Sequence, residues 1–125
     1  KIYVCNIMTQ PGETQGYTVA NHIQSIDKAC GQKLFDAVLV HKKAPSARAL
    51  IRYAKEESHP VFLDREAVTN SGRRIVSANV MSEDETGCVR HDHERLAQVL
   101  FRWYSGTPKG MRKLYKLFGK ESVIS

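Results

Sequence analysis

The sequence predicts an α/β fold built on a mostly parallel sheet. Short apolar runs alternate along the chain with segments in which apolar residues recur at helical spacing. The strand-like runs are continuously apolar, which is typical of parallel strands that are covered on both faces. The 125 residues are enough for one domain with a buried core.

Four segments have the composition of strands and are bounded by turn-forming residues. They are Lys1–Met8, Phe35–His41, Val61–Leu63 and Arg74–Met81. Crossovers between parallel neighbours are right-handed. We expect three or four of these strands to form a Rossmann-like, three-layer fold.

Helices are expected between and after the strands, where apolar residues recur every three or four positions. They run from the N-cap Thr18 to Gly31, from the N-cap Ser46 through Glu57, over one or two turns at Arg65–Asn70, and onward from the N-cap Asp92. The last of these helices is expected to direct five apolar residues inward: Leu96, Ala97, Val99, Leu100 and Trp103.

The net charge of +6 is concentrated at the end of the chain. Residues 105–125 carry five cations against Glu121, namely Lys109, Arg112, Lys113, Lys116 and Lys120. We therefore divide the chain into an α/β core, 1–104, and a basic amphipathic tail, 105–125, which is either a short helix or partly disordered. Such a tail attracts nucleic acid or an anionic membrane, although a solvated terminus is the more common role.

The three cysteines are odd in number, widely spaced and set in apolar or helical contexts. Cys5, Cys30 and Cys88 are therefore expected to be free thiols in a reducing compartment, not a disulfide framework. No apolar run approaches the roughly 18 to 20 residues that a membrane span needs. We expect a cytoplasmic protein.

The loop that follows the first expected strand, residues 6–18, is unusually rich in hydrogen-bonding groups. In a parallel sheet it lies at the carboxyl edge, where ligands bind, and the helix after it adds a partial positive charge. Pro11-Gly12 fits the centre of a type II turn. Asn6, Thr9, Gln10 and Thr14 add uncharged donors and acceptors, and Glu13 adds one anion. These groups suit a ligand with a phosphate and several hydroxyls; the alternative is that the polar side chains serve the loop's own backbone.

A second candidate is the stretch CVRHDH, residues 88–93, for which three interpretations compete. Cys88, His91 and His93 could ligate zinc, but a companion pair at a known spacing is missing. Asp92 could be only a helix N-cap. In the third interpretation the stretch is a loop entering a helix at the same sheet edge, so that Arg90 and His91 meet a phosphate there. The shared edge favours the third.

Four stretches, CNIMTQPGET, GYTVANHIQSI, DAVLVH and VRHDHERLAQVL, together resemble the gluconeogenesis-factor (YvcK-like) proteins. Those proteins belong with the 2-phospho-L-lactate transferases in the CofD-like superfamily. The resemblance covers residues 1 to about 103, and MTQPGET is highly specific. Family members begin with a glycine-rich phosphate-holding segment that has no counterpart here, so the resemblance implies the C-terminal part of a larger Rossmann-like domain.

The resemblance implies a regulatory protein that binds UDP-sugars, notably UDP-N-acetylglucosamine, and links gluconeogenic carbon metabolism to cell-wall synthesis and cell shape. It implies no established catalysis, no cofactor, and a homo-oligomer at full length. Arg90 matches the arginine of the family's R-H-D motif, which contacts the nucleotide sugar. The ligand-binding residues expected by this match are Asn6, Thr9, Gln10, Pro11, Gly12, Glu13, Thr14, Arg90, His91 and Asp92.

The resemblance also implies an alternative, because the transferase branch is catalytic. A protein of that branch moves a phospholactyl group from a nucleotide diphosphate onto a deazaflavin with magnesium. This chemistry needs a cluster of metal-binding carboxylates, and in the two loops only Glu13 offers one. The sequence of the MTQPGET motif favours the gluconeogenesis-factor branch, which binds UDP-sugars, over the transferase branch.

Overall fold

The computed structural model describes residues 1–118 of the chain. The chain forms two compact units, Lys1–His91 and a second that begins at Asp92. Residues 119–125, which include Lys120 and Glu121 of the expected tail, lie outside the described residues. Within residues 1–118, none of the helices combines the length and apolar character needed to cross a bilayer.

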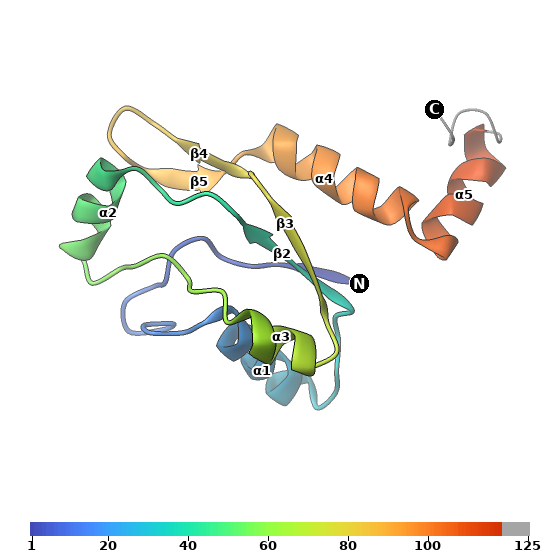
Figure 1. Ribbon diagram of the computed structural model, residues 1–125, viewed down its shortest axis with the longest axis horizontal. Helices are drawn as coiled ribbons and strands as arrows, with labels where there is room; N and C mark the ends of the chain where they lie inside the picture. Colours follow the sequence, from blue (N-terminus) through green and yellow to red (C-terminus); the bar gives the residue numbers. More distant parts are fainter. Residues whose placement is uncertain (119–125) are drawn as a thin grey trace. The chain divides into compact units, whose positions relative to one another are not determined.

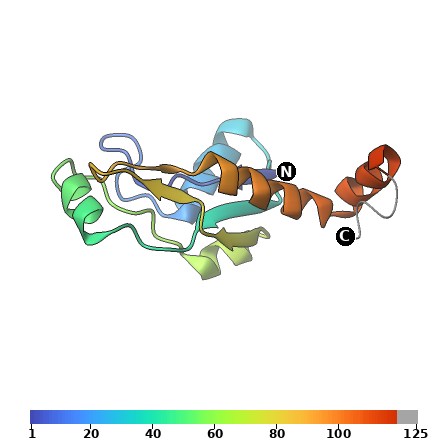
Figure 2. The same ribbon diagram turned by 90° about the horizontal axis from the view of Figure 1, so that it is seen from above.

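The first unit is built on a three-stranded parallel sheet in the order β1-β2-β3. Its strands are β1 (Ile2–Val4), β2 (Ala37–His41) and β3 (Arg74–Ala78), and β2 runs beside β3 in both views (Figures 1 and 2). Ile2 lies opposite Ala37, which in turn lies opposite Arg74. The α/β, Rossmann-like fold class is confirmed.

Two helices, α1 (Val19–Cys30) and α3 (Arg65–Asn70), lie on the same side of this sheet (Figure 1). Right-handed crossovers put both there, because the sheet grows from β1 to β3 in one direction. Their buried side chains meet those of β2 in one apolar core, formed by Cys5, Val19, Ala20, Ile23, Val38, Val40 and Val68. The bounds of α1 agree with the prediction: Thr18 caps its start, and Gly31 ends it with a left-handed φ of 69°.

Helix α2 (Ala47–Ala54) begins after the predicted N-cap Ser46 but ends before Glu57. Glu57 adopts a left-handed φ of 58°, and the Ser58 N–H donates to the Tyr53 carbonyl at 3.0 Å. A glycine usually provides this helix closure. Among the described residues, Glu57 is the one non-glycine with a positive φ. Backbone strain of this kind tends to occur near functional sites.

Three strand predictions need correction. The strand expected at Lys1–Met8 ends at Val4, and Met8 forms only an isolated antiparallel bridge with Pro60. Val61–Leu63 is not a strand, because its backbone bonds to the loop after β1 and to the start of α1 instead of to the sheet. Arg74–Met81 is two strands: β3 ends at Ala78, and Met81 begins β4 (Met81–Glu83), which pairs antiparallel with β5 (Val89–His91).

The second unit contains α4 (His93–Ser105) and α5 (Pro108–Phe118). Asp92 caps α4 as predicted. Four of the residues expected to face inward are half-buried, namely Leu96, Val99, Leu100 and Trp103, whereas Ala97 is exposed. The tail forms the helix α5 within residues 105–118, as one of the two alternatives predicted. Its cations Lys109, Arg112, Lys113 and Lys116 are all exposed.

Replacing Asp27 by alanine is expected to lower the free energy of unfolding by about 3 kcal/mol. The Arg73 side chain is only 4% exposed, and its Nη2 lies 2.6 Å from Asp27 Oδ2, so the variant leaves a buried charge without its partner. Urea denaturation measures the change. Asp36→Ala is the matched control, because the Asp36 side chain is 77% exposed and its ion pair with the N-terminus is worth little. Equal losses in the two variants would contradict the expectation.

Candidate functional site

The loop after β1 is held in place by the segment that follows α2. The Thr9 N–H donates to the His59 carbonyl (2.7 Å), and the His59 N–H donates to Thr9 Oγ1 (3.0 Å). Ser58 Oγ donates to the Thr9 carbonyl, and the Val61 N–H donates to the Ile7 carbonyl (2.9 Å). Thr9 is buried by these contacts. Its hydroxyl therefore positions the loop instead of being presented to a ligand.

The predicted turn at Pro11-Gly12 is confirmed. Gly12 has a φ of 79°, and the Glu13 N–H donates to the Gln10 carbonyl at 3.2 Å, as a type II turn requires. Thr14 Oγ1 accepts from the Gln10 N–H at 2.8 Å. Thr14 thus serves the loop's own backbone, whereas the Gln10 side chain is exposed.

The first turn of α1 does not leave its backbone donors for a ligand. The Val19 N–H donates to the Phe62 carbonyl (2.9 Å), and the Ala20 N–H donates to Asp64 Oδ1 (2.9 Å). The sequence had indicated a helix N-terminus that favours phosphate. Because Phe62 and Asp64 already accept from these two donors, the backbone N–H groups of Val19 and Ala20 are not available to an anionic ligand.

The loop and the strand β5 line a common depression of about 320 Å³, which we call the Arg90 pocket. It is lined by Asn6, Ile7, Met8, Thr9, Gln10, Pro11, Tyr53, Glu56, Ser58, Val89, Arg90 and His91. Six of the predicted ligand-binding residues therefore lie together: Asn6, Thr9, Gln10, Pro11, Arg90 and His91. The other four, Gly12, Glu13, Thr14 and Asp92, are not among the lining residues.

Arg90 reaches this pocket by a different route from the predicted one. It does not lie in a loop that enters a helix at the sheet edge; it lies in β5, where it pairs with Ser82 of β4. Helix α2 holds the hairpin: the Tyr53 hydroxyl accepts from the Val89 N–H (2.8 Å), and Arg52 Nη1 donates to the Thr86 carbonyl (2.8 Å). The side chains of α2 therefore fix the strand that presents Arg90.

The charges around the Arg90 pocket are mixed. Arg90 is exposed, and Glu56 lines the same depression. Asp84, in the β4–β5 turn, accepts from the Thr86 hydroxyl, which lowers the pKa of its carboxyl, and the nearby Arg90 charge adds to this effect. A phosphate bound by Arg90 would therefore compete with acidic neighbours, whereas carboxylates are good acceptors for sugar hydroxyls.

Asp92 takes the structural role that sequence reasoning had left open. Its carboxylate accepts from the Arg95 N–H at 3.1 Å as the N-cap of α4, and this hydrogen bond lowers its pKa. The zinc interpretation of Cys88, His91 and His93 gains no support. Over residues 1–118, no three His, Cys, Asp or Glu side chains are grouped so as to hold a metal ion.

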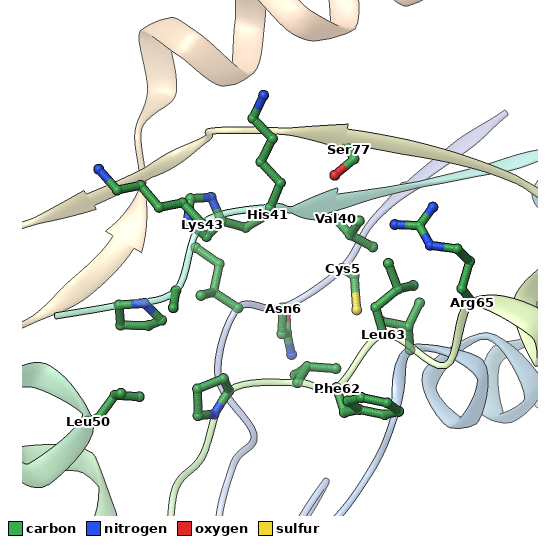
Figure 3. A pocket seen from close by; sticks show the side chains of 17 residues that line it. Cys5, Asn6, Val40, His41, Lys43, Leu50, Phe62, Leu63, Arg65 and Ser77 are labelled. Carbon is green, nitrogen blue, oxygen red and sulfur yellow. The ribbon is translucent and has the colours of Figure 1, made fainter. Parts of the chain in front are cut away.

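A second depression, of about 470 Å³, adjoins the first at Asn6 and Ile7; we call it the Phe62 pocket. It lies where β1 and β2 end. Its lining is Cys5, Asn6, Ile7, Val19, Val40, His41, Lys42, Lys43, Ala44, Pro45, Leu50, Pro60, Val61, Phe62, Leu63, Arg65 and Ser77. Figure 3 shows Phe62, Leu63 and Arg65 on one wall and Lys43 on another. Cys5 is buried in the apolar floor of this pocket, and this burial raises the pKa of its thiol to about 12.

Sequence reasoning missed several residues of these pockets, among them Tyr53, Glu56, Ser58 and Arg65. Tyr53 and Glu56 belong to the α2 region and carry no signal in the sequence. Arg65 did carry one, because it follows an apolar run and opens a helix. The rule that selected residues 6–18, a loop between a strand and a helix, selects this junction as well.

The parallel sheet and its crossover helices define an α/β protein of the Rossmann-like class, with two adjoining pockets at the carboxyl ends of its strands. Residues 1–81 match the family described as 2-phospho-L-lactate transferase CofD. The chain belongs to this family. The match includes the loop and the lining of the Phe62 pocket, but not Arg90.

Curated relatives carry the name gluconeogenesis factor. A putative gluconeogenesis factor of Nostoc sp. is 69% identical over 111 residues, which are 88% of this chain and 24% of the relative. One of Thermotoga maritima is 41% identical over 104 residues, 82% of this chain and 33% of the relative. The chain thus spans about a quarter to a third of the length of these relatives.

Solved structures show the same fold. A crystal structure of a Bacillus halodurans protein matches with a TM-score of 0.75 at 36% identity, covering 80% of this chain and 32% of that one. Another crystal structure from this organism, described as a member of the UPF0052 family, matches with a TM-score of 0.74 at 36% identity, over 78% of this chain and 31% of that one.

Replacing Tyr53 by phenylalanine is expected to lower the free energy of unfolding by about 1 kcal/mol, because the Val89 N–H loses its acceptor. Tyr17→Phe makes the same change at a tyrosine that contacts His22 edge-on through its ring, and it should cost less than about 0.5 kcal/mol. Urea denaturation of both variants measures the difference. If the two variants unfold at the same urea concentration, Tyr53 does not anchor β5.

Proposed function

We propose that this protein binds a nucleotide sugar resembling UDP-N-acetylglucosamine at the Arg90 pocket. In this proposal it acts as a regulator of the gluconeogenesis-factor type, linking gluconeogenic carbon metabolism to cell-wall synthesis and cell shape. The observation that carries the proposal is the convergence of Asn6, Gln10 and Arg90, from segments about eighty residues apart, on one depression. The names of the relatives support the gluconeogenic role.

The exposed groups of the pocket match the parts of such a ligand. Arg90 offers a planar fork of donors, which binds phosphate oxygens in pairs. The amide side chains of Asn6 and Gln10 are exposed and offer both donors and acceptors to sugar hydroxyls. Glu56 adds an acceptor. Thr9 and Thr14 contribute indirectly, since their hydroxyls hold the loop in shape.

The family description supports a second candidate, a transferase that moves a phospholactyl-type group from a nucleotide diphosphate. Magnesium-dependent chemistry needs a carboxylate cluster, and the part of the chain that the structure describes contains no such group. A turnover assay with a phospholactyl-bearing nucleotide diphosphate donor, a deazaflavin acceptor and magnesium discriminates between the candidates. Formation of phospholactyl-deazaflavin would favour the transferase.

Replacing Arg90 by alanine is expected to weaken binding of UDP-N-acetylglucosamine by about 30-fold, because hydrogen bonds between a guanidinium and a phosphate are among the strong ones. Isothermal titration calorimetry of the full-length protein measures the change. The matched control is Arg74→Ala, which removes an exposed arginine at the amino end of β3, the opposite edge of the sheet. Equal affinities of the Arg90→Ala variant and the wild type would remove Arg90 from the site.

A further inference from the structure

We infer that the Phe62 pocket binds the nucleobase of the nucleotide ligand, which stacks on the Phe62 ring. This inference rests on the proposed function and deepens it, because it assigns the two halves of the ligand to two pockets. The two pockets share Asn6 and Ile7, so a ligand that occupies both pockets crosses the wall that these two residues form. The diphosphate lies at this shared wall, and the sugar lies in the Arg90 pocket.

The ring of Phe62 provides an aromatic surface on which a nucleobase can stack. The residue is 69% exposed although it borders an apolar pocket. Its backbone is fixed on both sides: the Phe62 carbonyl accepts from the Val19 N–H, and the preceding Val61 N–H donates to the Ile7 carbonyl. A ring presented by a rigid backbone loses little freedom when a base stacks on it. Aromatic side chains bind bases in this way whatever the base, since each base has a π-face.

The cations of the Phe62 pocket suit the phosphates that follow the base. Lys42, Lys43 and Arg65 all line the pocket, and its lining contains no Asp or Glu. No carboxylate of the described residues lies within ion-pair distance of these three cations. Their charges are therefore available to an anionic ligand. Figure 3 shows Lys43 and Arg65 on different walls, so that a diphosphate between the walls meets cations from two directions.

The two pockets differ in the way that the two ends of a nucleotide sugar differ. The Phe62 pocket has a floor of Cys5, Val19 and Val40, which are members of the apolar core. The Arg90 pocket instead contains Gln10, Glu56 and other polar side chains. A purely apolar ligand would leave the cations of the Phe62 pocket unused, and a free phosphate would leave the Phe62 ring exposed. A nucleotide uses both.

Isothermal titration calorimetry measures the affinities of three ligands for the wild type and for the Phe62→Ala variant, each as the full-length protein. UDP and UDP-N-acetylglucosamine contain the base, whereas N-acetylglucosamine 1-phosphate does not. We expect Phe62→Ala to weaken the first two by about tenfold and to leave the third unchanged. Phe101→Ala, which removes an exposed phenylalanine of α4, is the matched control and should change none of them.

A second variant gives a direct signal. Phe62→Trp keeps the aromatic surface, so it should bind UDP at least as tightly as the wild type, and its added fluorescence should be quenched when UDP stacks on it. N-acetylglucosamine 1-phosphate should not quench it.

The outcomes separate the two proposals. If wild-type protein binds UDP and UDP-N-acetylglucosamine and Phe62→Ala binds both equally well, the nucleobase assignment is wrong and the proposed function stands. An unquenched Phe62→Trp variant that binds UDP leads to the same conclusion. If the wild type binds neither nucleotide, the nucleobase assignment and the proposed function are both wrong.

Discussion

The hydrogen bonds made by the segment 58–64 are the constraint on which the rest of the first unit depends. This segment bonds to the loop after β1 through Ser58, His59 and Val61, and to the start of α1 through Phe62 and Asp64. Each such bond contributes about 1 kcal/mol, and together they connect the segment to two parts of the chain that are distant from it in sequence, the loop after β1 and the start of α1. These bonds position the loop after β1 and cap the start of α1, and they hold in place the residues of the segment that line the Phe62 pocket. Both pockets therefore owe their shape to hydrogen bonds made outside the sheet, by the segments that follow β1 and α2.

Local signals in the sequence were sufficient for most of the helices and for the centre of the sheet. Thr18, Ser46 and Asp92 cap helices as predicted, and β2 matches the continuous apolar run before His41. Caps depend on a side chain and a backbone group three positions apart, so a single sequence contains all that is needed. The ends of β1 and α2 were predicted less well. They depend on Pro60, which bridges Met8, and on the left-handed Glu57, and no local pattern reveals either.

The segment Val61–Leu63 shows what an apolar run leaves undetermined. Its composition correctly indicates burial against the core, since Val61 and Leu63 pack there. It does not say which backbone the segment pairs with, and the partners turn out to be a loop and a helix start instead of a strand. The same ambiguity affected residues 88–93. Arg90 does line a pocket with the loop after β1, yet it does so because β5 pairs with β4 and is held by Tyr53. Shared placement at the sheet edge was the expectation; the cause is the β4–β5 hairpin together with its long-range hydrogen bond to Tyr53.

Part of the polar loop of residues 6–18 serves the protein's own backbone instead of a ligand. The hydroxyls of Thr9 and Thr14 accept from backbone N–H groups, and at the start of α1 the Phe62 carbonyl and the Asp64 carboxylate accept from the Val19 and Ala20 N–H groups. The backbone donors of that helix, which would bind an anion without losing freedom, are thus already used. The cations that line the two pockets are Arg90, Arg65, Lys42 and Lys43, and their long side chains lose rotamer freedom when they bind. In the proposed site a phosphate would therefore be bound at an entropic cost, and the apolar contact of a nucleobase with Phe62 would offset this cost.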